Sequence, residues 1–102
     1  GLLESAYEER LCHELQERNI PFKRQVKLPV QYKGVKLDCG YRLDVVVDKC
    51  VILELKAMEK LLPIHDAQLL TYLKLTDLRL GLLINFNTTI LKNGIKRIVN
   101  NL

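Results

Sequence analysis

Hydrophobic positions in the first part of the chain follow a helical period. From Leu2 to Arg18 apolar side chains recur every four positions, which predicts an amphipathic helix with a core-facing stripe at Leu3, Tyr7, Leu11 and Leu15. Asn19 and Pro21 are expected to end this helix, because Asn tolerates a left-handed C-cap and Pro cannot continue the helical backbone.

The pattern then changes to alternation, which is typical of strands buried on one face. Residues 24–31 (RQVKLPVQ) predict the first strand, and Pro29 predicts that this strand lies at the edge of a sheet. Residues 32–35 (YKGV) predict a hairpin turn into Lys36–Asp38.

Two stronger strands follow. Residues 41–47 (YRLDVVV) and 50–56 (CVILELK) predict a hairpin joined by a tight turn at 48–49. Successive strand side chains point to opposite faces, so Glu54 and Lys56 share one face of the second strand. A core strand loses stability when it buries charge without a partner, so these two charges call for an explanation.

The rest of the chain completes an α/β pattern. Pro63 opens a helix running to about Thr76, and its leucines at 69, 70 and 73 are expected to face the core. Residues 80–86 (LGLLINF) predict a strand covered on both faces and parallel to 50–56, whereas 94–100 form either an edge strand or a short helix. We therefore expect a mixed sheet of about four strands flanked by helices, in α-β-β-β-α-β order.

Composition adds limits to this picture. The 102 residues suit a single domain over 1–102, and 48% apolar against 27% charged residues argues against disorder. No apolar run approaches the roughly 20 residues that span a bilayer, so no membrane partner is expected. Three widely spaced cysteines indicate reduced thiols and a cytoplasmic location, and they lack the spacing of a zinc site.

The net charge of +4 is concentrated in two segments. Their basic residues are Lys23, Arg24, Lys27, Lys33 and Lys36, and then Lys92, Lys96 and Arg97. Such segments attract phosphate backbones, although a solvated face is the commoner explanation.

Asp44 and Glu54 lie on neighbouring predicted strands, and alternation allows both to project from one face near Lys56. Two converging carboxylates both stay ionised only if a cation joins them, and hard oxygen ligands favour Mg²⁺ or Mn²⁺. A nearby ammonium suits a reaction in which negative charge develops on phosphate. Taken alone, however, E-x-K at 54–56 is better explained as an exposed pair on a half-solvated strand.

The two predicted helices add further candidates. Glu4 and Glu8 lie one turn apart beside the apolar stripe of the first helix, so either could lean over the sheet. Gln68 and Tyr72 have the same spacing on the second helix, with solvent exposure and core packing as their structural alternatives. His65 is better explained by a structural role at the start of that helix.

The chain contains, in order, a helix glutamate, a strand aspartate, E-x-K on the hairpin strand and Q-x-x-x-Y on the next helix. This order of motifs resembles that of the PD-(D/E)XK nuclease superfamily. Residues 1–7 (GLLESAY) resemble the motif of its small GxxExxY proteins, and YRLDVVV, VILELKA, HDAQLLTYLKL, GLLINF and GIKRIV extend the resemblance over the whole chain. The resemblance implies a restriction-endonuclease-like core. Members usually carry another helix before this glycine, so we expect the chain to be trimmed there.

The resemblance also implies roles for the matching residues. Asp44 and Glu54 are expected to bind a metal ion together with the backbone carbonyl of Leu55. Lys56 is expected to orient or activate the attacking water. The superfamily's proline before the aspartate is replaced by Leu43, which changes little because that proline is dispensable.

The helix residues are assigned by the same resemblance. Gln68 is expected to act with the catalytic lysine, and Tyr72 to contact the substrate. The first-helix acid is ambiguous, because distance from the helix end favours Glu8 as the catalytic residue, whereas the GxxExxY motif favours Glu4. With Glu8 in catalysis, Glu4 is expected to lie at the substrate.

The expected function is therefore a Mg²⁺- or Mn²⁺-dependent nuclease that acts on DNA, with RNA still open. One alternative is a catalytically silent module that keeps the fold and binds nucleic acid or protein. Another is a structural or dimerisation domain. Symmetric cutting of both strands would need a homodimer, because one such site cleaves one strand at a time.

Overall fold

The computed structural model describes residues 2–37, 40–87 and 91–101. Its elements are α1 (Leu2–Glu17), β1 (Phe22–Lys27), β2 (Val30–Tyr32), β3 (Val35–Leu37), β4 (Arg42–Val47), β5 (Val51–Lys56), α2 (Pro63–Thr76), β6 (Leu80–Asn85), the 3₁₀ helix η1 (Leu91–Gly94) and β7 (Ile95–Val99). Neither α1 nor α2, the α-helices of this described part, has the length and apolarity needed to cross a membrane.

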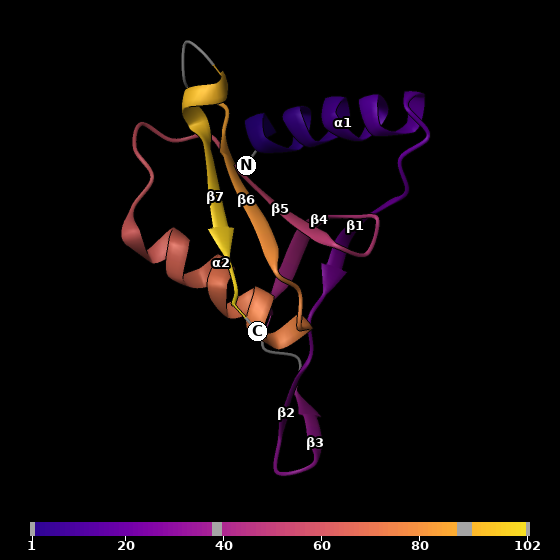
Figure 1. The fold of residues 1–102 in the computed structure, drawn as a ribbon, viewed down its shortest axis with the longest axis vertical. Helices are drawn as coiled ribbons and strands as arrows, with labels where there is room; N and C mark the ends of the chain where they lie inside the picture. The colour runs from indigo at the N-terminus through magenta and orange to yellow at the C-terminus, as the bar shows by residue number, and fades with distance from the viewer. Residues whose placement is uncertain (1, 38–39, 88–90, 102) are drawn as a thin grey trace.

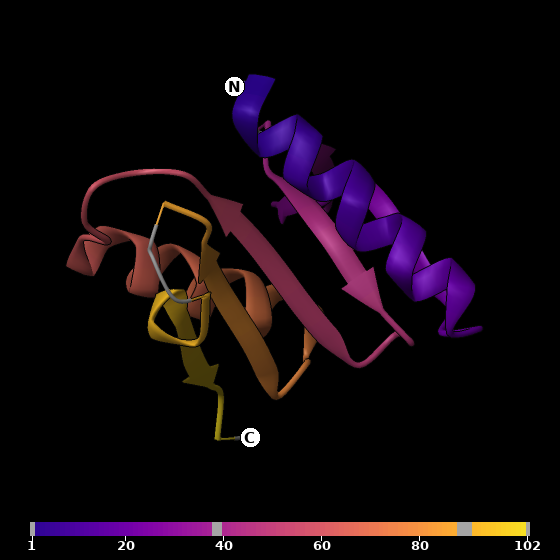
Figure 2. The same cartoon turned by 90° about the horizontal axis from the view of Figure 1, so that it is seen from above.

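A five-stranded mixed sheet in the order β1-β4-β5-β6-β7 forms the centre of the fold, with α1 and α2 on opposite faces (Figures 1 and 2). Neighbouring strands are antiparallel except β5 and β6, which are parallel as predicted. The α/β fold class is confirmed. The sheet has one strand more than expected, because residues 95–99, which follow the short helix η1, form β7. Strand β7 pairs with β6 and is an edge strand of the sheet.

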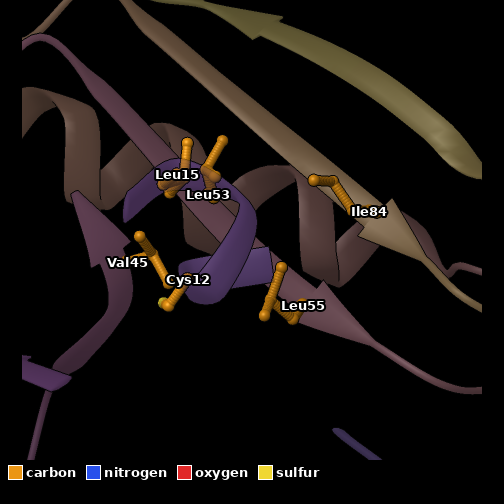
Figure 3. Packing of buried hydrophobic residues seen from close by; sticks show 6 residues of the cluster. All are labelled: Cys12, Leu15, Val45, Leu53, Leu55 and Ile84. Carbon is orange, nitrogen blue, oxygen red and sulfur yellow. The ribbon is translucent and has the colours of Figure 1, made fainter. Parts of the chain in front are cut away.

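Each helix covers its own apolar core. The core under α1 joins the buried residues Cys12, Leu15, Val45, Leu53, Leu55 and Ile84 (Figure 3). The core under α2 joins Leu43, Ile52, Leu69, Tyr72, Leu73 and Leu83. Strand β5 contributes to both cores, because its side chains alternate between the two faces of the sheet.

The buried face of α1 differs from the predicted stripe. Leu3 is 55% exposed, whereas Glu8 and Cys12 are buried. Residues 8, 12 and 15 share one helical face, and this face lies against the sheet. Asn19 takes the expected left-handed conformation after the helix, with φ of 56°.

The first predicted strand is divided into two. Strand β1 ends at Lys27, and β2 then pairs with β3 in a separate two-stranded hairpin. Pro29 lies between them, where its missing N–H ends the pairing with β4. Strand β1 is an edge strand, as predicted from Pro29. The predicted end of the hairpin at Asp38 falls outside the described residues.

Candidate active site

The β4–β5 ladder gives way to side-chain hydrogen bonds at the two predicted carboxylates. Register pairs run from Val47–Val51 to Val45–Leu53, and Asp44 and Glu54 come next on their strands. The backbone N–H of Asp44 donates to Glu54 Oε1 at 3.3 Å. The backbone N–H of Leu55 donates to Asp44 Oδ2 at 2.8 Å. The structure therefore brings these two acids together.

The regular alternation of side chains between the two faces of the sheet is interrupted in β4 at Asp44. Leu43 belongs to the α2 core and Val45 to the α1 core, although residues two apart on a regular strand share a face. Strand β1 is irregular at the same level, because Gln25 has a φ of 49°. The paired residues of β1 and β4 pass from Arg24–Val45 directly to Val26–Leu43. Asp44 thus lies where its side chain enters neither core.

Burial and mutual repulsion disfavour the charged form of this pair. Glu54 is only 5% exposed, and burial together with repulsion from Asp44 raises its pKa to about 8. Burial also raises the pKa of Asp44, although the hydrogen bond from Leu55 and the charge of Lys56 oppose that shift. A bound cation would relieve both costs.

The donor set fits a hard divalent cation. Two carboxylates supply anionic oxygen. The N–H and C=O of a strand residue point to the same side, so the carbonyl of Leu55 points toward β4, as its N–H does. Among the described residues, no group of three or more His, Cys, Asp or Glu side chains could hold a metal ion. The candidate centre therefore depends on the backbone carbonyl as a third ligand.

Lys56, Gln68 and Tyr72 meet in a hollow of about 430 Å³ between the end of β5 and α2, and Tyr41 also lines it. Tyr72 is buried, and its ring lies 5.8 Å from that of Tyr41, measured between centroids. Burial and the negative charge of Glu54 raise the pKa of Tyr72, whereas a hydrogen bond with Gln68 lowers it. Lys56 acts electrostatically on both Asp44 and Glu54, so this hollow adjoins the carboxylate pair.

His65 lines the same hollow but has a structural contact. Its Nδ1 accepts a hydrogen bond from the backbone N–H of Leu62 at 3.0 Å, before the first turn of α2. The expected structural role at the start of this helix is confirmed.

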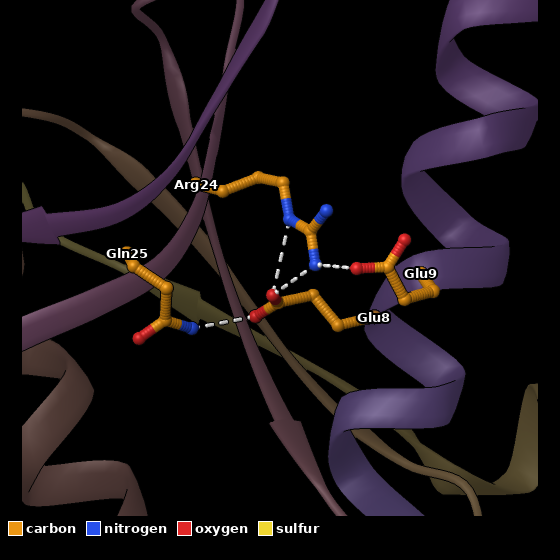
Figure 4. Close-up of polar contacts among 4 residues, drawn as sticks. All are labelled: Glu8, Glu9, Arg24 and Gln25. Atoms are coloured by element: carbon orange, nitrogen blue, oxygen red, sulfur yellow. Dashed lines mark hydrogen bonds and ion pairs between the residues drawn. The ribbon is translucent and has the colours of Figure 1, made fainter.

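Two residues of β1, Arg24 and Gln25, donate hydrogen bonds to the carboxylate of Glu8 (Figure 4). Arg24 donates to Glu8 Oε2 from Nε at 3.1 Å and from Nη2 at 2.7 Å, and Nη2 also donates to Glu9. Gln25 Nε2 donates to Glu8 Oε1 at 2.7 Å. Both oxygens of this buried carboxylate therefore have donors.

The two first-helix acids share a second hollow with Asp44. This hollow, of about 210 Å³, is lined by Glu4, Glu8, Gln25, Asp44 and neighbouring residues. Both glutamates act to raise the pKa of Asp44, Glu8 more than Glu4. Both glutamates thus lie on the Asp44 side of the carboxylate pair, and the geometry does not select one of them as the catalytic acid.

The sequence analysis did not predict the hydrogen bonds from Arg24 and Gln25 to Glu8, which together we call the clamp on Glu8, or the burial of Asn85. Arg24 was noted only as one residue of a basic segment, and nothing in the neighbouring sequence indicates that Gln25 contacts Glu8. Asn85, 3% exposed, receives the N–H of Met58 at Oδ1 (3.1 Å) and donates from Nδ2 to the carbonyl of Met58 (2.8 Å). It thereby fixes the chain just after Lys56. An amide within the apolar run 80–86 was the available signal.

Comparison with known proteins bears on this site. The family model described as the PD-(D/E)XK nuclease superfamily matches residues 1–98. The searches of curated proteins and of solved structures gave no match.

Proposed function

Because the chain belongs to the PD-(D/E)XK nuclease superfamily, we propose that it is a metal-dependent phosphodiesterase that cleaves DNA, related to the GxxExxY proteins. The observation that supports the proposal is a pair of hydrogen bonds, from the Leu55 N–H to the Asp44 carboxylate and from the Asp44 N–H to the Glu54 carboxylate, which bring a half-buried and a buried carboxyl group together on β4 and β5. An arrangement that serves stability alone would not place two carboxyl groups side by side where burial and mutual repulsion disfavour their charged forms.

Asp44, Glu54 and the carbonyl of Leu55 would hold the ion. A bound Mg²⁺ or Mn²⁺ would supply Lewis-acid activation of water and neutralise charge on the phosphate. Lys56 extends from the same strand, and its ammonium orients the attacking water and stabilises negative charge on the phosphoryl oxygens as they become more anionic.

The residues of α2 position the lysine and the substrate. Gln68 lies one turn before Tyr72 on α2, and both line the hollow that contains Lys56. Tyr72 presents its hydroxyl end toward a bound strand while its ring packs in the core. Glu8, with Glu4 as the alternative, contributes a further carboxylate beside Asp44 that orients water or a second bound ion.

The test is cleavage of a panel of single-stranded, duplex and branched DNA, and of RNA, with Mg²⁺ or Mn²⁺. We expect the wild-type protein to cleave DNA, and Lys56→Ala to lose at least about 100-fold in rate, as when one group that stabilises developing charge is removed. Arg10→Ala, which changes an exposed residue of α1, is the matched control. Equal inactivity of the wild-type protein and Lys56→Ala on every substrate rejects the proposal.

One observation favours a catalytically silent binding module instead. Glu8 has its donors from Arg24 and Gln25, so this acid is satisfied without a metal ion. Calorimetry with Mg²⁺ and Mn²⁺ separates the two functions. Absence of metal binding, together with salt-sensitive DNA binding, supports the silent module. Metal binding that Glu54→Gln abolishes supports the nuclease.

A further inference from the structure

The β2–β3 hairpin is an exposed projection of the fold. It forms its own two-stranded sheet and extends beyond the end of the five-stranded sheet (Figure 1). A two-stranded hairpin by itself is marginally stable in water, because it buries little apolar surface. A binding partner is one way in which such a hairpin gains order.

Basic residues dominate the charge of this region, although Asp38 follows it directly in the sequence. Residues 22–37 contain five basic residues and no acidic residue: Lys23, Arg24, Lys27, Lys33 and Lys36. Arg24 is neutralised by Glu8 and Glu9. Lys27, Lys33 and Lys36 are all exposed, and they follow the chain from the end of β1 to the hairpin.

Two like charges stand opposite each other at the base of the hairpin. Lys27 of β1 pairs directly with Arg42 of β4, and both residues are exposed. Cβ atoms of directly opposed residues lie about 5 Å apart, and like charges at such positions are destabilising. An anion that contacts both side chains would remove this repulsion.

This base adjoins the candidate active site. Arg42 is two residues before Asp44, and Tyr41 lines the hollow that contains Lys56. The backbone N–H of Leu28 donates to the carbonyl of Tyr41 at 2.9 Å, which ties the start of the hairpin segment to the wall of that hollow. A polyanion bound at Lys56 would therefore pass next to Lys27 and Arg42.

We propose that Lys27, Arg42 and the β2–β3 hairpin form an arm that binds the phosphate backbone of DNA on one side of the scissile bond. This inference rests on the proposed nuclease function. Lys33 is eleven residues before Asp44, so by the maximum reach of the chain the two residues lie within about 40 Å of each other. At about 3.4 Å per nucleotide, the arm spans at most about twelve nucleotides. The arm gives the enzyme a length requirement rather than a sequence preference.

The first test is binding, measured without divalent metal by fluorescence anisotropy on a DNA duplex of about 20 base pairs, a length that exceeds the span of the arm. The arm variant is Lys33→Asn/Lys36→Gln, with Asn at position 33 because this residue has a φ of 50°. The control is Arg10→Gln/Lys74→Gln, which removes two exposed charges from the helices.

We expect the arm variant to lose about tenfold in affinity, and its log–log salt slope to fall by about 1.8, the value for two phosphate contacts. The control should change less than about twofold. Equal losses in the two variants, or no loss in either, overturn the proposal. Polyglutamate that displaces DNA as effectively as unlabelled duplex also overturns it and points to an acidic protein as the partner.

The second test separates this inference from the proposed function. With Mn²⁺, the arm variant should cleave a DNA hairpin with a stem of about five base pairs at the wild-type rate, and cleave the long duplex about tenfold more slowly at subsaturating concentration. Equal slowing on both substrates overturns the arm. If the wild-type protein cleaves neither substrate, the nuclease function fails, while the anisotropy measurement still decides whether the hairpin binds DNA.

Discussion

The carboxylate of Asp44 accepts the backbone N–H of Leu55 at 2.8 Å, in a position where a continuous ladder would supply a backbone carbonyl. One oxygen of the side chain therefore takes the place of the backbone acceptor in a β-sheet hydrogen bond, and this bond keeps β4 and β5 joined beyond Val45–Leu53. The same bond fixes the direction of the carboxylate. A residue that is proposed to bind metal thus also has a structural role, and substitutions can separate the two.

Replacing Asp44 with Asn tests this separation. The side-chain carbonyl of Asn can accept the same hydrogen bond, while the repulsion with Glu54 is removed. We expect Asp44→Asn to be at least as stable as wild type at pH near 8 by urea denaturation, and to lose at least about 100-fold in cleavage rate. Asp44→Ala should be less stable than Asp44→Asn by about 1–3 kcal/mol, because the N–H of Leu55 loses its partner. Full activity of Asp44→Asn would remove this residue from the metal site.

The pKa of Glu54 predicts how stability depends on pH. Burial and Asp44 raise this pKa from 4.5 to about 8 in the folded protein. Since the folded state favours the protonated form, this contribution to stability is fully present below the unfolded pKa and is lost as pH rises toward about 8. We expect the free energy of unfolding of the metal-free protein to decrease over this interval.

Urea denaturation across that pH range provides the measurement. Glu54→Gln should flatten the dependence, whereas Glu14→Gln, a change at an exposed residue of α1, should leave it as in wild type. Mg²⁺ or Mn²⁺ should stabilise wild type more near pH 8 than near pH 5, because protons compete with the metal ion for these oxygens. A pH dependence that Glu54→Gln leaves unchanged would show that Glu54 does not titrate in this range.

Periodicity was sufficient to predict the elements that carry the site. Alternation located β4 and β5, the proline at 63 marked the start of α2, and the apolar run at 80–86 predicted a strand parallel to β5. Because β4 and β5 are joined by a tight turn, their register follows from the turn, and Asp44 and Glu54 had to be neighbours. Local sequence thus determined which carboxylates meet.

The environment of the first-helix acids was beyond such reasoning. The clamp on Glu8 needs Gln25 at a positive φ, a conformation that a glutamine seldom adopts and that no neighbouring residue signals. It also needs α1 to turn residues 8 and 12 rather than Leu3 toward the sheet. Tertiary packing decides both features, because the apolar stripe of α1 is compatible with several rotations about its axis.

The contact between Glu8 and Arg24 should contribute to stability despite its partial exposure. The Glu8 side chain is 9% exposed and that of Arg24 33% exposed, and two guanidinium nitrogens donate to one carboxylate oxygen. A double-mutant cycle with Glu8→Gln and Arg24→Gln should give a coupling energy of about 1 kcal/mol after allowance for solvent screening. The pair Glu14 and Arg18, which is exposed on α1, is the control and should couple by less than about 0.5 kcal/mol. Equal coupling in the two pairs would mean that burial of Glu8 adds nothing.

Gly81 on β6 allows α2 to approach the sheet closely. A Cβ atom at this position would lie 2.9 Å from Cγ, Cδ1 and Cδ2 of Leu69, a residue of α2 that is 0% exposed. Because Leu69 is fully buried in the α2 core and would have to shift, Gly81→Ala should destabilise the protein by about 1–3 kcal/mol through overpacking. Urea denaturation measures this cost.

The matched variant is Leu69→Ala, which removes the atoms that the new Cβ would meet and is itself expected to cost about 2–5 kcal/mol through the cavity that it leaves. In the double variant the added methyl enters that cavity. Its loss of stability should therefore be smaller than the sum of the two single losses by at least about 1 kcal/mol. Strict additivity would show that the cost of Gly81→Ala arises in the backbone of β6 and not from contact with α2.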